Sequence, residues 1–345
     1  MRTSGSRLFI LIFLLSLSSY LIHRSLLDQK FQLVKRYPRV PRRNITILLW
    51  HWPFGRSYSL HGDTCLDKYN ISQCFLSDKP STFSFADVVV FHHHELKNGR
   101  SSLPLHLARP ASQHWVWLSM EPPVNNGNLT PYKDLFNWTM SYRRDADIFI
   151  PYGKTVPEID NLNYEVPQNR SCLVSWVVTK YHSDQARAAI YQSLKNYLPI
   201  EVYGGWTKRY LSKKELLPTI GRCLFYLAFE NSEATDYISE KLWRNAFQAG
   251  AVPVVFGPNR ATYEALAPPG SFIHVKDFHS HADLAAYLKS LASDRQAYEA
   301  YFQWHRTHRI KTYTDWRERL CQICVNYARL PTNKVYFDLE SWVKR

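Results

Sequence analysis

The densest group of candidate catalytic side chains lies in residues 225–255. Within it, Tyr237, Glu240 and Lys241 are spaced i, i+3 and i+4, so on a helix they would share one face of the first turn. A helix N-terminus beside a lysine suits a pyrophosphate, and a glutamate there could hold ribose hydroxyls. An ordinary amphipathic helix with a charged outer face is the alternative interpretation of the same spacing.

Two more charged residues stand beside predicted strands. Glu121 directly follows the apolar run 115–120, and two prolines then end that strand. This carboxylate is either a general base, because nearby apolar side chains raise its basicity by desolvation, or a solvated acid at a strand end. Arg187 lies in the first turn of a later helix, where it either completes an anion clamp with Lys241 or faces solvent.

Two other groups of side chains have the composition of metal sites. Asp145 and Asp147 form an Asp-x-Asp triplet, which is a weak signal for metal binding. Arg143-Arg144 precedes it and would compete for both carboxylates, so salt-bridged structural acids are the favoured interpretation. The run His92-His93-His94-Glu95 ends a predicted strand, where consecutive side chains diverge, so one ion could hardly use all three histidines. Some of them are candidates for the acceptor side of a cleft.

The elements that position these residues have the pattern of an α/β fold. The apolar runs are continuous rather than alternating, as in strands buried on both faces, and helical patterns separate the later runs. Strand followed by helix, repeated, implies parallel sheets. The predicted strands are 45–50, 86–91, 115–120, 148–150, 173–178, 224–229, 252–256 and 272–275, and the predicted helices are 184–198, 236–249, 260–267 and 282–291.

A segment without hydrophobic period, residues 161–169, separates a first group of strands from a second. We place the domain boundary there, which agrees with the two domains that 345 residues allow. Two Rossmann-like halves facing a cleft would carry their ligand chemistry at the carboxyl ends of the strands. Glu121 would then come from the first half, and Arg187 and Lys241 from the second.

The N-terminal 43 residues differ in composition from the rest. Residues 8–22 are uncharged and mostly apolar, and as a helix they span about 22 Å against a hydrocarbon core of ~30 Å, so a cleaved signal peptide competes with a signal anchor. The basic stretch 24–43 resembles a juxtamembrane stem and favours the anchor. Residues 1–43 hold nine Lys or Arg and one acid, which is +8 of the formal charge of +14. The remaining +6 argues against a nucleic-acid-binding surface.

Five sequons place the folded body in the secretory lumen. The positive-inside rule alone would keep it in the cytoplasm, because Lys and Arg are denser after the apolar segment than before it. Asn-x-Ser/Thr triplets, however, receive sugar only in the lumen. They begin at Asn44, Asn70, Asn128, Asn137 and Asn169.

Six cysteines agree with an oxidising compartment. Cys65 and Cys74 close a short loop. Cys321 and Cys324 form a lone CxxC, which lacks the second ligand pair of a zinc site and the early βαβ unit of a redox site. The expected disulfides are Cys65–Cys74, Cys321–Cys324 and, unless both cysteines stay free, Cys172–Cys223.

These residues resemble a known enzyme family, the Golgi alpha-1,3-fucosyltransferases of glycosyltransferase family 10. The family signature is similar to FYLxFENS...DYxxEKxxxNAxxAGxVPVVxGP, and residues 225–258 read FYLAFENSEATDYISEKLWRNAFQAGAVPVVFGP. Further matching stretches cover the chain from about residue 44 to its C-terminus; they are LLWHWPFG, FHHHEL, WVWLSMEPP, SYRRDADIFIPYG, SWVV and TDWRERLCQIC. The EKLWRN and TDWRERLCQIC variants are most similar to the subtype that fucosylates sialylated N-acetyllactosamine to make sialyl Lewis x.

The resemblance implies a GT-B enzyme that moves L-fucose from GDP-fucose to the 3-hydroxyl of N-acetylglucosamine with inversion. Its acceptors would be N-acetyllactosamine glycans on glycoproteins or glycolipids. Cationic side chains would replace a divalent ion, so we expect no obligatory metal or cofactor. Glu121 matches the catalytic base, and the matching donor contacts are Arg187, Glu230, Asn231, Tyr237, Glu240 and Lys241.

The resemblance also implies a type II Golgi membrane protein with a lumenal catalytic body. The implied parts are a cytoplasmic tail (1–7), a signal-anchor helix (8–22), a basic stem (23–43), an acceptor-side Rossmann-like domain (44–165) and a GDP-fucose-binding Rossmann-like domain with a C-terminal disulfide segment (166–345). Residual basic charge, including Arg56, would favour a sialylated acceptor. Two alternatives stay open: a secretory glycan-binding protein without catalysis, and a metal-dependent GT-A transferase using Asp145 and Asp147.

Overall fold

The first half of the chain builds a six-stranded sheet with the order β2-β1-β3-β4-β5-β6. The computed structural model of the protein describes residues 44–158, 164–168 and 170–345. All neighbouring strands of this first sheet are parallel. Val88 and Val90 of β3 fill the core on one face, and Val89 and Phe91 fill the core on the other. The strands are β1 (Ile45–Leu49), β2 (Cys74–Ser77), β3 (Val88–His92), β4 (His114–Ser119), β5 (Trp138–Ser141) and β6 (Ile148–Phe149).

The second half builds a five-stranded parallel sheet with the order β12-β11-β10-β8-β9. Its central strand β10 is also buried on both faces, because Phe225 and Leu227 enter one core while Tyr226 and Ala228 enter the other. The predicted parallel α/β architecture is therefore confirmed. The strands are β8 (Cys172–Val177), β9 (Ile200–Tyr203), β10 (Cys223–Phe229), β11 (Val252–Phe256) and β12 (Ile273–His274).

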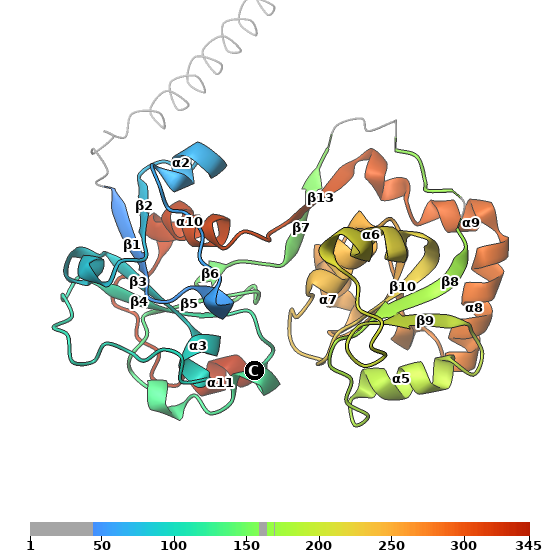
Figure 1. The fold of residues 1–345 in the computed structure, drawn as a ribbon, viewed down its shortest axis with the longest axis horizontal. Coiled ribbons are helices and arrows are strands. Elements are labelled where there is room, and N and C mark those ends of the chain that lie inside the picture. The colour runs from blue at the N-terminus through green and yellow to red at the C-terminus, as the bar shows by residue number, and fades with distance from the viewer. Residues whose placement is uncertain (1–43, 159–163, 169) are drawn as a thin grey trace, which may run out of the picture. The chain divides into compact units, whose positions relative to one another are not determined.

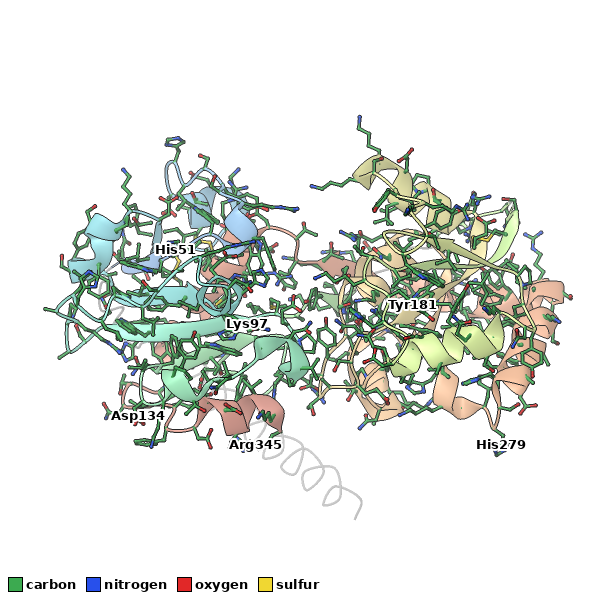
Figure 2. The ribbon with its side chains drawn as sticks, turned by 60° about the horizontal axis from the view of Figure 1, so that its bottom comes forward. His51, Lys97, Asp134, Tyr181, His279 and Arg345 are labelled. Atoms are coloured by element: carbon green, nitrogen blue, oxygen red, sulfur yellow. A yellow bond between two sulfur atoms is a disulfide. The ribbon has the colours of Figure 1, made fainter. Side chains whose placement is uncertain are left out.

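Helices cover both faces of each sheet (Figure 1). The first sheet packs α2 and α10 on one face and α3 and α11 on the other, and the second packs α5 and α8 on one face and α6, η4 and α7 on the other. Figure 2 draws the side chains, with His51 and Lys97 in the first half and Tyr181 and His279 in the second. The helices are η1 (Pro53–Gly55), α2 (Thr64–Tyr69), η2 (Pro80–Phe85), α3 (His93–Lys97), α4 (Pro123–Asn126), η3 (Thr130–Tyr132), α5 (Ala186–Leu194), α6 (Lys213–Gly221), η4 (Lys241–Gln248), α7 (Arg260–Leu266), η5 (Val275–Asp277), α8 (His281–Ser293), α9 (Arg295–Ala300), η6 (Gln303–Arg306), α10 (Trp316–Asn326), η7 (Tyr327–Arg329) and α11 (Leu339–Lys344).

The C-terminal segment belongs to the first half, which corrects the expected second domain of residues 166–345. The chain leaves the first sheet through β7 (Gly153–Pro157) and returns through β13 (His308–Thr312), and these two strands pair antiparallel. Helix α10 then buries Leu320 and Ile323 against the first sheet. Sequence order could not show this return, because an amphipathic helix does not say which sheet it covers.

The helix expected at residues 236–249 begins five residues later. Asp236 adopts a left-handed conformation with φ 59°, and its carboxylate accepts hydrogen bonds from the backbone N–H and Nε of Arg144 at 3.0 and 2.9 Å. The regular helix η4 starts at Lys241 and is a π-helix, a rare form that is frequent at functional sites. Tyr237 therefore lies before the helix, and the expectation that it shares a first helical turn with Lys241 is wrong.

Two of the three expected disulfides are also wrong, because α10 returns to the first sheet. Cys321 pairs with Cys65 of α2, and Cys324 pairs with Cys74 of β2. Residues i and i+3 share one face of a helix, so α10 turns both cysteines of the CxxC toward α2 and β2. The third bridge joins Cys172 and Cys223, which are register partners on β8 and β10.

The N-terminal tail, apolar segment and stem expected at residues 1–43 lie outside the described residues, as does the sequon asparagine Asn169. Among the helices of residues 44–158, 164–168 and 170–345, none combines the length and apolar character needed to cross a bilayer.

We predict that the Cys65→Ser/Cys321→Ser double variant has a free energy of unfolding lower by about 2–3 kcal/mol, because with Cys74–Cys324 intact this bridge closes a further loop of about a dozen residues. Thermal unfolding of the purified protein measures the effect. Peptide mass spectrometry under non-reducing conditions should recover Cys65 linked to Cys321. Recovery of Cys321 linked to Cys324 instead would contradict the pairing.

Candidate functional site

A cavity of about 540 Å³ lies at the carboxyl ends of strands from both sheets. Glu121 lines it from the loop after β4 and Asn125 lines it from α4, while Val177 to Lys180 line it from the end of β8. In the second sheet, β8 lies between β9 and β10, so the chain reverses its direction of winding there. Ligands of doubly wound sheets bind at this kind of switch point.

Glu121 is held with one carboxylate oxygen engaged. Asn125 donates its Nδ2–H to Oε2 of Glu121 at 2.8 Å, and among the described residues no donor reaches the other oxygen. Asn126 steadies the same loop by donating to the backbone carbonyls of Glu121 and Pro122, both at 3.3 Å. The half-buried carboxylate therefore presents a free oxygen while its orientation is fixed.

Tyr152 supports this loop from the crossover between the sheets. Its phenol donates to the backbone carbonyl of Met120, the residue before Glu121, at 2.6 Å. Burial raises the pKa of Tyr152 well above its ordinary value, so the phenol stays protonated and continues to donate. Tyr152 also lines the cavity.

The cationic side of the cavity is built on a buried ion pair. Lys241 donates from Nζ to Oε2 of Glu230 at 2.9 Å and to the hydroxyl of Ser239 at 2.8 Å. Burial opposes the charge on Lys241, but the carboxylates of Glu230 and Glu240 outweigh it, so the pKa of Lys241 is raised. Glu230 also accepts from the backbone N–H and the hydroxyl of Ser239, at 2.7 and 2.8 Å. Lys241 is consequently a fixed cation at the cavity wall.

Arg187 supplies a second cation from helix α5. It is only 7% exposed, and its guanidinium donates to the side chain of Gln185 and to the backbone carbonyl of Lys180, both at 2.8 Å. Burial lowers its pKa, yet among the described residues no carboxylate lies within 4 Å of it. Neither contact neutralises its charge, so Arg187 is poised to bind an anion in the cavity.

Of the remaining predicted donor contacts, three line the cavity and one lies behind its lining. Tyr237, Glu240 and Asn231 line the cavity together with Lys241. Asn231 brings a buried Oδ1 that has no hydrogen-bond donor among the described residues, which suits a ligand hydroxyl. Glu230, expected to contact the donor, is 1% exposed and not among the lining residues. Glu230 lies behind the lining residues, where it pairs with Lys241 and fixes the position of its ammonium group.

Several lining residues were not predicted from the sequence. Asn125 and Tyr152 lack a distinctive motif, although each follows a predicted strand closely. Tyr210, from the segment between β9 and α6, and Leu216, from α6 itself, also line the cavity. The exposure of Tyr210, at 73%, is unusual for an aromatic ring, but exposure cannot be read from sequence.

The Asp-x-Asp triplet does not form a metal site. Asp145 pairs with the guanidinium of Arg143 at 2.7 Å. Asp147 accepts from the backbone N–H of Thr139 at 2.9 Å and from Nζ of Lys334 at 2.6 Å. Neither aspartate lines the cavity of Glu121, which supports the interpretation of both as structural acids.

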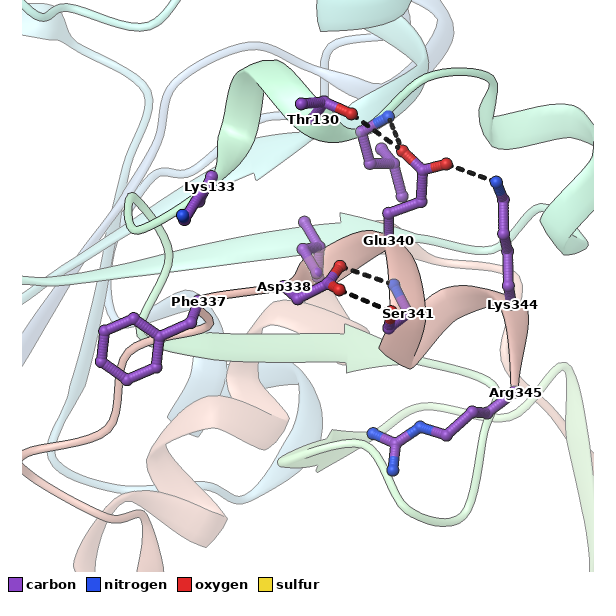
Figure 3. Close-up of a pocket in the computed structure, with 10 residues that line it drawn as sticks. Thr130, Lys133, Phe337, Asp338, Glu340, Ser341, Lys344 and Arg345 are labelled. Atoms are coloured by element: carbon purple, nitrogen blue, oxygen red, sulfur yellow. Dashed lines mark hydrogen bonds and ion pairs between the residues drawn. The ribbon is translucent and has the colours of Figure 1, made fainter.

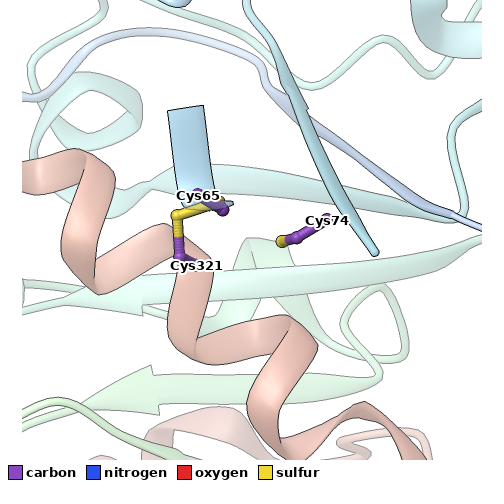
Figure 4. Close-up of side chains that lie close together, drawn as sticks. All are labelled: Cys65, Cys74 and Cys321. Carbon is purple, nitrogen blue, oxygen red and sulfur yellow. A yellow bond between two sulfur atoms is a disulfide. The ribbon is translucent and has the colours of Figure 1, made fainter. Parts of the chain in front are cut away.

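The three histidines do not converge on one point: the rings of His92 and His94 lie 6.0 Å apart, and His93 packs on Trp117 instead. His92 and His93 are buried, and desolvation lowers their pKa values to about 3 and about 4, so both are neutral. Within the described part of the chain, one group of three potential ligands could share an ion: Cys65, Cys74 and Cys321, whose sulfur atoms lie within 4.8 Å of one another (Figure 4). All three are disulfide-bonded and cannot act as thiolates.

A larger cavity of about 700 Å³ surrounds the C-terminal helix α11 (Figure 3). Its carboxylates already have partners. Asp338 accepts from the backbone N–H of Ser341 at 2.8 Å, and Glu340 accepts from the backbone N–H of Leu129 at 3.0 Å and pairs with Lys344. None of the predicted catalytic or donor-binding residues lines this cavity, so we assign the chemistry to the cavity of Glu121.

Comparison with known proteins finds family models and relatives that match most of the chain. The model described as "Glycosyltransferase family 10 (fucosyltransferase) C-term" matches residues 167–342, and the model "Fucosyltransferase, N-terminal" matches residues 42–153. The alpha-(1,3)-fucosyltransferase 7 of Mus musculus is 48% identical over 304 residues, covering 88% of this chain and 77% of that protein. The Homo sapiens protein of the same name is 47% identical over 303 residues, covering 88% and 87%.

More distant proteins share the fold. The 4-galactosyl-N-acetylglucosaminide 3-alpha-L-fucosyltransferase 9 of Bos taurus is 39% identical over 297 residues, covering 86% of this chain and 81% of that protein. A crystal structure of an alpha1,3-fucosyltransferase with GDP-fucose has a TM-score of 0.54 at 16% identity and covers 88% of this chain and 95% of that one.

We predict that Lys241→Met lowers the free energy of unfolding by about 3–5 kcal/mol, because it leaves Glu230 as an unpaired buried charge. The matched double variant Lys241→Met/Glu230→Gln should recover most of this loss, since the amide still accepts from Ser239. Chemical denaturation of the three proteins measures both effects. Equal stability of the single variant and the wild type would contradict a buried pair.

Proposed function

The chain belongs to glycosyltransferase family 10, and from this premise we propose that it transfers L-fucose from GDP-fucose to the 3-hydroxyl of N-acetylglucosamine in lactosamine glycans. One observation carries the proposal: a half-free carboxylate, Glu121, lines the same cavity as the cations Arg187 and Lys241. That arrangement supplies what displacement of a diphosphate by a sugar hydroxyl requires.

The donor would bind with its diphosphate against the two cations. The bond between fucose C1 and the β-phosphate oxygen breaks, and negative charge accumulates on that oxygen. Lys241 and Arg187 neutralise it from positions that the fold has already fixed, so little reorganisation is needed during reaction. Glu240, Asn231 and Tyr237 line the same cavity and are placed to hold sugar hydroxyls.

Glu121 would act on the acceptor. As the 3-hydroxyl oxygen forms a bond to C1 from the face opposite the departing diphosphate, its proton passes to the free carboxylate oxygen, and the configuration at C1 inverts. Asn125 keeps the other oxygen in place. GDP and the fucosylated glycan are the products, and the proton leaves Glu121 to solvent before the next turnover.

Neither alternative function has comparable support. Binding of a glycan alone does not require a carboxylate with a free oxygen in the same cavity as two cations. A metal-dependent GT-A transferase would need Asp145 and Asp147 free, whereas both are paired to cations of the first half. We therefore propose donor binding by cationic side chains, with no obligatory metal.

We also propose that the protein is a type II Golgi membrane protein with its catalytic body in the lumen. Residues 8–22 would be the anchor, and the five sequons and three disulfides agree with an oxidising lumen. Of the sequon asparagines that the structure describes, Asn44, Asn70 and Asn128 are exposed and Asn137 is partly buried. The proposed acceptor half includes the C-terminal segment after β13.

We predict that Glu121→Gln lowers kcat by about 100-fold or more, because the amide cannot accept the proton. The affinity for GDP, measured by calorimetry, should stay near that of the wild type, since the diphosphate contacts are untouched. The control Glu158→Gln changes an acid that directly follows β7 and does not line the cavity, so it should leave turnover intact. Near-normal turnover in Glu121→Gln would remove the base assignment.

A sialylated lactosamine is the acceptor we propose, so that the product is of the sialyl Lewis x type. Arg56 is exposed directly after η1, where its charge is available to an anionic sugar. Arg56→Gln should lower kcat/KM for the sialylated acceptor by about two- to fivefold, as expected for one exposed ion pair. The rate on neutral lactosamine is the internal control. An equal change on both acceptors would count against the assignment of Arg56.

A further inference from the structure

Phe54 has a backbone conformation that bulky residues rarely adopt. In the turn η1 after β1 it has φ 56° and ψ 24°, in the left-handed region, although the next residue is a glycine that adopts this region freely. The residue as a whole is 43% exposed. Strained backbone of this kind persists where the surroundings impose it, and such positions concentrate at functional sites.

The surroundings of Phe54 impose this conformation. Glu95 of α3, itself 3% exposed, accepts a hydrogen bond from the backbone N–H of Phe54 at 2.7 Å. Pro53 is buried and fixes the turn on the other side. The fold therefore uses a buried carboxylate and a proline to hold a phenyl ring outward, where the hydrophobic effect alone would turn it inward.

The ring is part of a larger aromatic surface. Its centroid lies 4.8 Å from the ring of His94 and 6.4 Å from that of Trp316, and both of these side chains are partly exposed. We call Phe54, His94 and Trp316 the aromatic platform. The three residues come from η1, α3 and α10, so three separate segments converge on it.

Two chains of contacts connect the platform to the catalytic cavity. Through α3, His93 donates to the backbone carbonyl of Asn126 at 2.7 Å, next to the asparagine that holds Glu121. Because β1, β3 and β4 are neighbouring parallel strands, the segments that follow them lie along one edge of the sheet.

The second connection runs through α10. The guanidinium of Arg319 lies 4.9 Å from the ring of Trp316 and 5.4 Å from the ring of Tyr152, which lines the cavity. The platform residues do not line the cavity themselves, but the segments that carry them pack on the same sheet that positions Glu121.

We propose that the aromatic platform binds the apolar face of an acceptor pyranose, with Phe54 as its central ring. This inference rests on the proposed function and identifies a residue that selects the acceptor. The galactose next to the reacting N-acetylglucosamine fits best, because its axial 4-hydroxyl leaves the opposite face with only C–H groups. Such a face packs on an aromatic ring, while the ring edges of the sugar keep their hydroxyls for polar partners.

The test compares Phe54→Gly with Phe54→Trp. Glycine removes the ring and accepts the left-handed backbone, so the variant should fold with an unfolding temperature at or above that of the wild type. Its KM for N-acetyllactosamine should rise about tenfold, while its KM for GDP-fucose stays unchanged. Phe54→Trp keeps an aromatic surface and should retain acceptor affinity. The matched control is Phe85→Ala, because Phe85 is 61% exposed in η2 and outside the platform.

A binding measurement makes the result independent of turnover. In saturation-transfer NMR with N-acetyllactosamine, the wild type should saturate the galactose C–H protons most strongly, and Phe54→Gly should lose this effect. An unchanged acceptor KM and unchanged saturation in Phe54→Gly would overturn the proposal, as would an equal rise of both KM values. If the wild type transfers no fucose but shows the galactose saturation, the proposed function fails and the platform stands.

Discussion

The buried pair of Glu230 and Lys241 is the interaction on which the site depends. Glu230 has three hydrogen-bond donors, two from Ser239 and one from Lys241, which stabilise its charge, although burial still raises its pKa. This pairing lets the fold keep a cation permanently at the cavity wall. Because the charge is fixed before any ligand arrives, stabilising a leaving diphosphate requires little movement of the protein. Ser239 lies just before η4, and from there its backbone N–H and hydroxyl both reach Glu230.

The return of the C-terminal segment to the first half has a comparable role on the other side. Disulfides from Cys65 and Cys74 fasten α10 to the first sheet. From this helix, Arg319 packs against the ring of Tyr152, whose phenol in turn holds the backbone carbonyl before Glu121. The orientation of the candidate base therefore depends on a segment some 200 residues later in the chain. This long-range dependence explains why the segment cannot be assigned to the second domain that precedes it in sequence.

The sequence predicts correctly those elements whose pattern is set by burial, and it fails for features that depend on contacts between distant segments. Strands such as β10 and β11 are buried on both faces, so their apolar runs marked them directly, whereas the short strand β5 contains Thr139 and Ser141 and gave no such signal. Glu121, Arg187 and Lys241 were found because strand ends and helix starts are local features. The disulfide partners of Cys321 and Cys324, and the place of Glu230 behind the wall, are set by packing between distant segments. Spacing along the chain carries no information about such packing.

The chemistry of the cavity walls leaves one group suited to remove a proton. Burial raises the pKa values of Tyr152 and Tyr237 well above the ordinary value, so both remain protonated phenols and cannot remove a proton from the acceptor. Burial also acts on Glu240, but Lys241 beside it outweighs this effect and lowers its pKa, which makes Glu240 a weak base. Lys241 and Arg187 are cations. Glu121 differs from all of these, since one of its oxygens is fixed by Asn125 and the other has no donor among the described residues. The roles of the two sides therefore follow from where the fold places opposite charges. On the donor side, Lys241 and Glu240 are paired and Arg187 is available to bind an anion. On the acceptor side, Glu121 is a carboxylate with one oxygen available to accept a proton.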